Sequence, residues 1–258
     1  MKIATWNING VRARLDTALN WVKEAVPDIL CLQEIKCEDA AFPSEMFEEL
    51  GYNVSTHGQK GFNGVAVLAR DGPIRERRRG LPGDVDDTHS RYLEVEVDGL
   101  VVASIYLPNG NPQPGPKFDY KLAWFERLIE HASSLISSSK PVLLVGDYNV
   151  VATDGKGDIY SPASWKNDAL LQPESREAYR RLLAQGWTDA IHALHPGEPI
   201  YTFWDFFRNR FARDAGLRID HLLLNAPAAA RLTQAGVDKA VRAREKPSDH
   251  APAWVVMS

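Results

Sequence analysis

The segment VLLVGDYN, residues 142–149, contains the strand on which the predicted fold depends. Its first four residues form the most apolar run of the chain and predict a strand buried on both faces. The run ends at Gly146, after which a carboxylate and an amide follow at Asp147 and Asn149. If the backbone stays extended there, both side chains lie on one side of it. A simple turn explains the same residues, because glycine, aspartate and asparagine favour turns.

The strands and helices predicted around this segment indicate the fold class. Hairpins and helical crossovers are mixed: the turn Asp98-Gly99 joins two strands, whereas residues 117–136 have apolar side chains at helical spacing. This order favours an α/β fold of two packed sheets, mixed or mainly antiparallel, with helices outside, over a doubly wound parallel sheet. No linker-like tract divides the chain, so residues 1–258 are predicted to form one domain. The predicted strands are 3–6, 29–32, 65–69, 91–97, 100–107, 142–145, 219–224 and 253–257, and the predicted helices are 15–25, 43–50, 117–136 and 175–185.

Composition limits the class of protein. Hydrophobic residues make up 44% of the 258 residues and charged residues 25%, which is typical of a soluble globular protein. The formal net charge of -4 does not indicate a nucleic-acid-binding protein, so a DNA-binding surface would have to concentrate its basic residues locally. The cysteines, Cys31 and Cys37, are too few for a disulfide framework. Neither a signal peptide nor an apolar span of about 18 residues is found, so a cytoplasmic location is expected.

Further polar clusters follow or interrupt apolar runs elsewhere in the chain. They supply amides, carboxylates and a histidine, which together with Asp147 and Asn149 are about the groups needed to hydrolyse a phosphodiester with a hard cation. The clusters are TWNING at residues 5–10, LQE at 32–34, RIDH at 218–221 and SDH at 248–250.

Each N-terminal cluster allows two interpretations. Glu34 follows a buried strand and can bind Mg²⁺ there, but a surface ion pair with Lys36 explains it more simply when it is taken alone. Asn7 and Asn9 share one side of an extended backbone and can bind phosphate or metal-bound water. A capped turn before Gly10 explains the two asparagines equally well.

The C-terminal clusters contain a candidate Asp–His pair. Asp220 precedes an apolar strand and His250 closes residues 247–250. A carboxylate bonded to one ring nitrogen of a histidine fixes the tautomer and raises the basicity of the other nitrogen. The sequence does not show whether the two residues meet. His221 is predicted to be structural, because it begins a strand, and Asp147 is a second candidate to accept a proton from water.

Aromatic and basic runs provide possible contacts to DNA. The run YTFWDFF at residues 201–207 is followed by several arginines and predicts either a core strand or a sugar pocket beside phosphate-binding groups. Basic residues also concentrate at 75–79 and 239–246. Such runs are usually solvated faces, but in a chain of negative net charge they are also the candidate DNA tracks.

Over its whole length the chain resembles the bacterial exonuclease III family of apurinic/apyrimidinic endonucleases, within the endonuclease/exonuclease/phosphatase superfamily. The matching segments follow one another in the order and spacing of that family. The resemblance implies a four-layered α/β sandwich with the site at one edge between the two sheets. The segments are NING at 7–10, LQE at 32–34, HGQKG at 57–61, residues 106–109, GDYN at 146–149, GLRID at 216–220 and residues 245–252.

The resemblance also implies a reaction and roles for particular residues. The implied reaction is Mg²⁺- or Mn²⁺-dependent hydrolysis of double-stranded DNA on the 5′ side of abasic sites, with trimming of 3′ ends, by a monomeric enzyme. Glu34 is the implied metal ligand, with Asn9 and Asp249 as nearby or outer ligands. The implied catalytic residues are Tyr106, Asp147, Asn149, Asp220 and His250, and the implied substrate-binding residues are Asn7, Asn109, Phe203, Leu217 and Ile219, of which the last three match an apolar pocket for an abasic sugar.

Some alternatives stay open at this point. The group that takes the proton from water is either Asp147 or the Asp220–His250 pair. The segment 155–171 carries only Lys156 and Lys166, whereas some relatives place several basic residues there, so the strength of exonuclease activity relative to abasic-site incision is undetermined. The alternative functions are a phosphoesterase of the same superfamily acting on small phosphoesters or lipids, and a DNA-binding module without catalysis. The aromatic and arginine runs favour DNA, and every expected catalytic position is filled.

Overall fold

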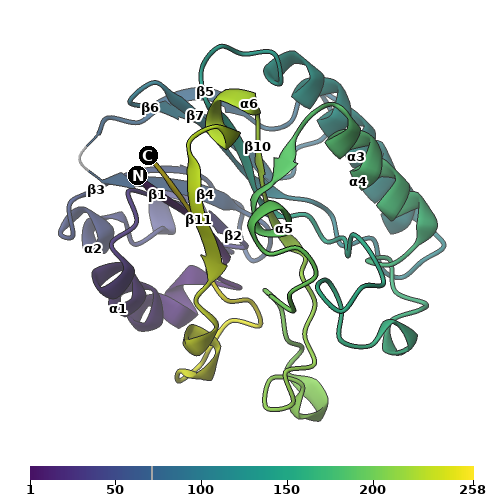
Figure 1. Ribbon diagram of the computed structural model, residues 1–258. Coiled ribbons are helices and arrows are strands. Elements are labelled where there is room, and N and C mark those ends of the chain that lie inside the picture. The colour runs from purple at the N-terminus through teal and green to yellow at the C-terminus, as the bar shows by residue number, and fades with distance from the viewer. Residues whose placement is uncertain (71) are drawn as a thin grey trace.

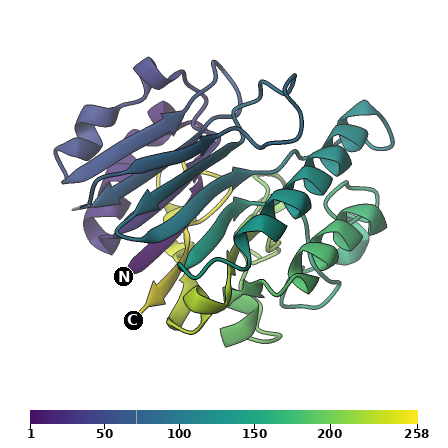
Figure 2. The ribbon, with the colours of Figure 1, turned by 90° about the horizontal axis from the view of Figure 1, so that it is seen from above.

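Two six-stranded sheets packed face to face form the centre of the computed structural model, which describes residues 1–70 and 72–258 (Figure 1). Helices cover the outer face of each sheet, as the view from above also shows (Figure 2). The four-layered α/β sandwich predicted from the sequence is therefore confirmed.

The first sheet has the strand order β11-β12-β1-β2-β4-β3. Its central pair, β1 and β2, is parallel, and the other neighbours are antiparallel. The sheet is thus mixed, as predicted. Its strands are β1 (Lys2–Asn7), β2 (Ile29–Gln33), β3 (Tyr52–His57), β4 (Val65–Arg70), β11 (Leu232–Val237) and β12 (Ala253–Met257).

The second sheet has the order β5-β6-β7-β8-β10-β9, and here the parallel pair is β7 and β8. The run VLLV forms the first four residues of β8, in which every residue is buried. Because β10 runs antiparallel to β8, its first residue lies beside the last residue of β8. The strands are β5 (Arg75–Arg79), β6 (Tyr92–Val97), β7 (Leu100–Tyr106), β8 (Val142–Asp147), β9 (Thr188–Asp189) and β10 (Asp220–Leu224).

Apolar side chains fill the space between the sheets and the space under the helices. Val67 and Val145 belong to the cluster between the sheets, Trp124 to the cluster under α3 and α4, and Trp21 to the cluster under α1 and α2. Burying one large apolar side chain contributes about 1.5–3 kcal/mol, so these three layers hold the strand ends in place. No helix within the described residues is long and apolar enough to cross a membrane. The helices are α1 (Leu15–Ala25), α2 (Ser44–Glu48), α3 (Pro116–Leu135), α4 (Pro173–Ala184), α5 (Ala190–Leu194) and α6 (Ala226–Ala229).

Strands β3, β5, β9 and β11 were not predicted from the sequence. Strand β5 illustrates the reason, since its residues RERRR are all exposed at the edge of the second sheet and show no apolar alternation. Its pairing with β6 depends on backbone hydrogen bonds, which leave no signature in the side chains. Two of its arginines form ion pairs, Arg77 with Glu94 at 3.0 Å and Arg79 with Asp39 at 2.9 Å. The use of this run as a DNA track stays a prediction.

The aromatic run at residues 201–207 is not a core strand, so that interpretation was wrong. Phe203 makes only isolated bridges, to Leu217 and to His250. Trp204 is buried, whereas Phe206 and Phe207 are 50% and 73% exposed. The run therefore passes from the core to the surface beside His250, instead of continuing through either sheet.

Candidate active site

The ends of four strands bring the predicted residues to one edge of the sandwich. Asn7, Tyr106 and Asp147 are the last residues of β1, β7 and β8, and Glu34 follows the last residue of β2. The register of the strands places Tyr106 and Asp220 on either side of Asp147, because both are its pairing partners in the second sheet. The parallel pairs β1–β2 and β7–β8 each end at this edge, which explains why residues distant in sequence meet there.

Asn7 joins the two sheets at this edge. Its side-chain nitrogen donates to Glu34 Oε1 at 3.0 Å and to Asp147 Oδ2 at 2.9 Å. Asn7 itself is fully buried, and its side-chain oxygen accepts the backbone N–H of Asn9. A single amide thus holds two carboxylates at a fixed separation, one in each sheet.

Asp220 and His250 do meet, as the sequence had left open. The ring of His250 donates from Nδ1 to Asp220 Oδ2 at 2.7 Å, and its Nε2 lies 3.7 Å from Asp147 Oδ2. Burial disfavours the charged ring, but Asp220 and Asp147 outweigh this effect and raise the pKa of His250 to about 10. Burial raises the pKa of Asp147 to about 7, although the nearby His250 opposes the rise. The imidazolium is therefore the stable form of His250 at neutral pH.

Asn149 lies in a turn and also contributes its side chain to the site, so both interpretations of residues 146–149 hold in part. Its φ is 47°, so its backbone is left-handed and not extended. The main chain therefore forms the predicted turn. The turn is closed by the Asn149 N–H, which donates to Asp147 Oδ1 at 2.9 Å. The side chain of Asn149 donates to the carbonyl of Leu107 and accepts from Asn109 Nδ2 at 3.1 Å. The turn therefore gathers Asp147, Asn149 and Asn109 into one group.

Tyr106 completes the group on the side of the second sheet. Its hydroxyl is hydrogen bonded to Glu34, and burial together with the Glu34 charge raises its pKa well above the ordinary value of 10.0. The guanidinium of Arg91 lies over the ring at 4.7 Å. Tyr106 consequently keeps its proton and remains a hydrogen-bond donor. Arg91 was not predicted as a site residue, because nothing in the sequence marks it except its position at the start of an alternating strand.

Glu34 forms an ion pair with Lys36, which was the simpler of its two interpretations. Lys36 Nζ lies 2.8 Å from Glu34 Oε2 and also donates to Asn9 Oδ1 at 2.5 Å. Asn9 in turn donates to Asp249 Oδ1 at 2.9 Å. Burial raises the pKa of Glu34, but the hydrogen bonds from Asn7 and Lys36 outweigh this effect and lower it. Glu34 is therefore ionised.

The donor set at Glu34 fits a hard divalent cation that keeps most of its water. Within residues 1–70 and 72–258, no group of three or more His, Cys, Asp or Glu side chains is arranged to enclose a metal ion. A closed zinc-type site is thus excluded for this part of the chain. Mg²⁺ usually binds through one or two carboxylates and retains several waters, and Glu34 with the nearby amides supplies oxygen ligands of that kind.

The residues matched to a sugar pocket form one cluster, but its inner members are covered. Leu217 and Ile219 are 0% and 2% exposed. Phe203 and Trp165 pack against them from the outside, with their rings edge to face at 6.1 Å. Phe203 also contacts the ring of His250, at 5.1 Å. The cluster therefore borders His250, and its accessible surface comes from the two aromatic rings.

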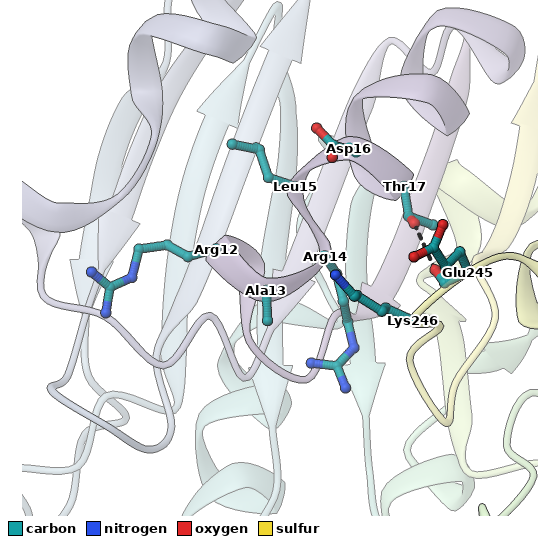
Figure 3. Close-up of a pocket in the computed structure, with 8 residues that line it drawn as sticks. All are labelled: Arg12, Ala13, Arg14, Leu15, Asp16, Thr17, Glu245 and Lys246. Carbon is teal, nitrogen blue, oxygen red and sulfur yellow. Dashed lines mark hydrogen bonds between the residues drawn. The ribbon is translucent and has the colours of Figure 1, made fainter.

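A surface cavity lies beside the site residues, next to Asn9. Figure 3 shows this cavity, which has a volume of about 260 Å³ and is lined by residues 12–17 together with Glu245 and Lys246. Arg14 connects this cavity to the site, because its guanidinium donates to the carbonyl oxygens of Asn9 and Pro247. His221 lies away from the site; it is fully buried and donates to the carbonyl of Val150 at 3.0 Å, as expected of a structural histidine.

Comparison with known proteins gives consistent matches along the chain. The model of the Endonuclease/Exonuclease/phosphatase family matches residues 4–250. Exodeoxyribonuclease III of Haemophilus influenzae is 37% identical over 265 residues, which cover 98% of each chain. The solved structure of an AP endonuclease from Archaeoglobus fulgidus aligns with a TM-score of 0.95 at 36% identity, covering 100% of this chain and 99% of the other. The 3′ phosphatase NExo from Neisseria, bound to a product DNA hairpin, gives the same TM-score, identity and coverage.

Proposed function

Because the chain belongs to the endonuclease/exonuclease/phosphatase family, we propose that it is a DNA repair nuclease that hydrolyses the backbone on the 5′ side of abasic sites. The observation that carries the proposal is the Asn7 bridge between Glu34 and Asp147, with His250 beside it. This arrangement offers one carboxylate to a cation and another to water at a single site. A general base and a cation each lower the barrier when an unactivated phosphodiester is hydrolysed.

Asp147 is the proposed general base. It is a buried carboxylate whose pKa of about 7 suits proton transfer near neutral pH. His250, with a pKa of about 10, keeps its charge in that range and is therefore assigned to a non-bridging phosphate oxygen. Asp220 holds the His250 ring through Nδ1 and stabilises its charge. Of the two candidates that the sequence left open, the proposal therefore takes Asp147 as the general base.

The bond changes follow from these assignments. The oxygen of water forms a bond to phosphorus as Asp147 takes its proton, and the 3′ oxygen of the upstream nucleotide leaves. The products are a 3′-hydroxyl and a 5′-phosphate on the abasic fragment. Asn149 and Asn109, which are hydrogen bonded to each other, are assigned to the phosphate, and Tyr106 is assigned as the donor to the leaving oxygen because it keeps its proton. Asn7 keeps Asp147 in position.

We assign Glu34 as the residue that holds Mg²⁺, or Mn²⁺ in its place. Bound there, the cation supplies positive charge that stabilises the charge developing on the leaving oxygen. Asn9 and Asp249, which are hydrogen bonded to each other, are assigned to the water around the cation. Lys36 already places a positive charge beside Glu34, so it both competes with the cation and keeps the carboxylate ionised.

The proposed substrate is double-stranded DNA, with the abasic sugar against Phe203 and Trp165. Arg210 lies over the ring of Trp165 at 4.7 Å and brings a positive charge to this surface. A second activity, trimming of blocked 3′ ends, is favoured by the burial of Leu217 and Ile219. A sugar swung out of a duplex needs an apolar surface to receive it, which only Phe203 and Trp165 offer here, whereas a terminal phosphate needs only the proposed catalytic residues. The likeness to the 3′ phosphatase NExo supports this second activity.

A comparison of two duplexes tests the proposal. An abasic duplex and an undamaged blunt duplex are incubated with the protein in Mg²⁺ and, in parallel, in EDTA. We expect incision at the abasic site in Mg²⁺ only, and Glu34→Gln should need a much higher Mg²⁺ concentration than wild type. Hydrolysis of a phosphoinositide with both duplexes intact would instead support the lipid alternative. Binding without any cleavage would support the non-catalytic module.

A further inference from the structure

Lys121 is a buried cation that the proposed mechanism does not use. It belongs to α3, is 0% exposed, and makes no ion pair within the described residues. Its ammonium instead donates to three backbone carbonyl oxygens: Asn149 at 2.6 Å, Asn109 at 3.0 Å and Ala169 at 3.4 Å. Burial of an ammonium is costly, and here it lowers the pKa of Lys121 to about 7, although the charges of Asp168 and Asp147 oppose the shift. A hydrophobic residue at this position would avoid that cost.

The three carbonyls belong to separate segments that are also joined by side-chain hydrogen bonds, such as the one from Asn109 Nδ2 to Asn149 Oδ1 at 3.1 Å, and Lys121 links their backbones. Asn109 follows β7, Asn149 follows β8, and Ala169 lies in the irregular segment between β8 and α4. The backbone closes tightly on the lysine stem, since a Cβ at Gly110 would lie 2.6 Å from Lys121 Cδ. Gly110 also has a φ of +91°, which other residues rarely adopt. The loop after β7 is therefore shaped around this side chain.

The two nearest carbonyls belong to the amides assigned to the phosphate. The left-handed backbone of Asn149 directs its carbonyl toward Lys121 while its side chain faces Asn109. Without the ammonium, the buried carbonyl of Asn149 and the partly buried carbonyl of Asn109 would lose a donor, and the segments would shift to find water or other partners. A shift of about 1 Å at a reacting group can cost about 100-fold in rate.

We propose that Lys121 is a positioning residue that fixes Asn109 and Asn149 against the scissile phosphate by holding their backbone carbonyls. This inference rests on the proposed function, because it assigns those two amides to phosphate binding. Lys121 does not touch the substrate, so its removal should affect the rate of the bond-breaking step and leave the affinity for DNA nearly unchanged. A lysine that only stabilised the fold would change the amount of folded protein and not the rate per folded molecule.

Lys121→Met removes the ammonium and keeps an unbranched side chain that fills the space of the lysine stem. Single-turnover cleavage of an abasic duplex at saturating protein gives the rate, fluorescence anisotropy gives the Kd, and thermal unfolding gives the folded fraction. We expect the rate per folded molecule to fall by about 100-fold, with the Kd changing by less than about threefold. Ser175→Ala is the matched control, since Ser175 donates to the same Ala169 carbonyl at 2.9 Å but contacts neither asparagine. Its rate should stay within about twofold of wild type.

The outcomes separate this inference from the proposed function. If wild type cleaves the duplex and folded Lys121→Met cleaves it within about threefold of that rate, Lys121 is not a positioning residue. If wild type itself does not cleave, the proposed function fails first. Should Lys121→Met not fold, Lys121→Gln is measured, because it keeps a polar group in the same cavity. Its shorter side chain cannot reach all three carbonyls, so its rate per folded molecule should still fall by about 10-fold or more, and an unchanged rate would overturn the inference.

Discussion

Asn7 donates a 2.9 Å hydrogen bond to Asp147, although the two residues are 140 positions apart and end strands of different sheets. The same amide nitrogen binds Glu34. One neutral group thus holds two carboxylates that have separate proposed roles, and the two sheets come into register through it.

Replacing Asn7 tests this bridge. Asn7→Ala removes the shared donor, so Glu34 and Asp147 lose their common partner and their fixed separation. We expect cleavage of an abasic duplex to fall by about 100-fold, measured as the single-turnover rate. Asn7→Asp should be worse, because it adds a third carboxylate to the pair. A rate for Asn7→Ala close to that of wild type would show that the bridge is dispensable.

The pH dependence of cleavage tests the division of roles between Asp147 and His250. Asp147 must lose its proton to act as a base, so the rate should rise with pH around a midpoint of about 7. His250 must keep its proton, so the rate should fall again as the pH passes about 10. His250→Gln should remove the alkaline fall while the acid limb remains. If the rate is constant from about pH 6 to about pH 8, Asp147 is not the base.

A buried ion-pair network centred on Arg218, between Leu217 and Ile219, should contribute strongly to stability. Arg218 binds Asp158 at 2.6 Å and Asp189 at 2.7 Å, and all three side chains are buried. Arg218→Met leaves two buried carboxylates without their partner, so we expect a loss of about 3–5 kcal/mol in the free energy of unfolding. Urea denaturation measures this loss. A change below about 1 kcal/mol would mean that the network contributes little.

The same network predicts the response of stability to acid. Burial disfavours the charge on Asp189, but Arg218 and His221 outweigh this effect and lower its pKa below the ordinary value of 3.8. A lowered pKa in the folded state means that the stabilisation is complete above pH 3.8 and is lost as the pH falls below it. Asp189→Asn should therefore weaken this loss, relative to wild type, when unfolding is followed as a function of pH. Parallel pH profiles for the two proteins would contradict the assignment.

Trp165 is expected to influence which DNA substrate is preferred. It packs over the cluster that contains Leu217 and Ile219. Trp165→Ala should open that cluster to an abasic sugar, so the ratio of abasic-site incision to 3′-phosphate removal should rise severalfold. Both activities are measured on matched duplexes in Mg²⁺. An unchanged ratio would mean that the covered cluster does not limit access of the sugar.

Much of the fold was predictable because apolar periodicity is a local property. Helix α1 and strand β12 begin and end at the predicted residues, Leu15–Ala25 and Ala253–Met257. Strand β5 was missed because an exposed edge strand needs no apolar side chains. The left-handed turn at Asn149 was one of two interpretations, and only the surrounding structure decides between them.

The site was predictable as a set of residues but not as a set of contacts. Each polar cluster at a strand end was visible in the sequence, yet the Asn7–Asp147 and Asp220–His250 contacts depend on sheet pairing between distant segments. Lys121 had a signal that was overlooked: it lies on the buried face of α3, between Phe118 and Phe125. A lysine on an apolar stripe of a helix indicates a buried polar partner, although the identity of that partner cannot be derived from periodicity.

The central claim is that water attacks phosphorus on the 5′ side of an abasic site, and cleavage in H₂¹⁸O tests it most directly. The products of an abasic duplex are analysed by mass spectrometry after one turnover in Mg²⁺. Hydrolysis by water should place one ¹⁸O atom in the 5′-phosphate of the abasic fragment and leave the 3′-hydroxyl of the other fragment unlabelled. Cleavage without ¹⁸O incorporation, with an unsaturated sugar at the new 3′ end, would indicate elimination instead of hydrolysis and would contradict the account.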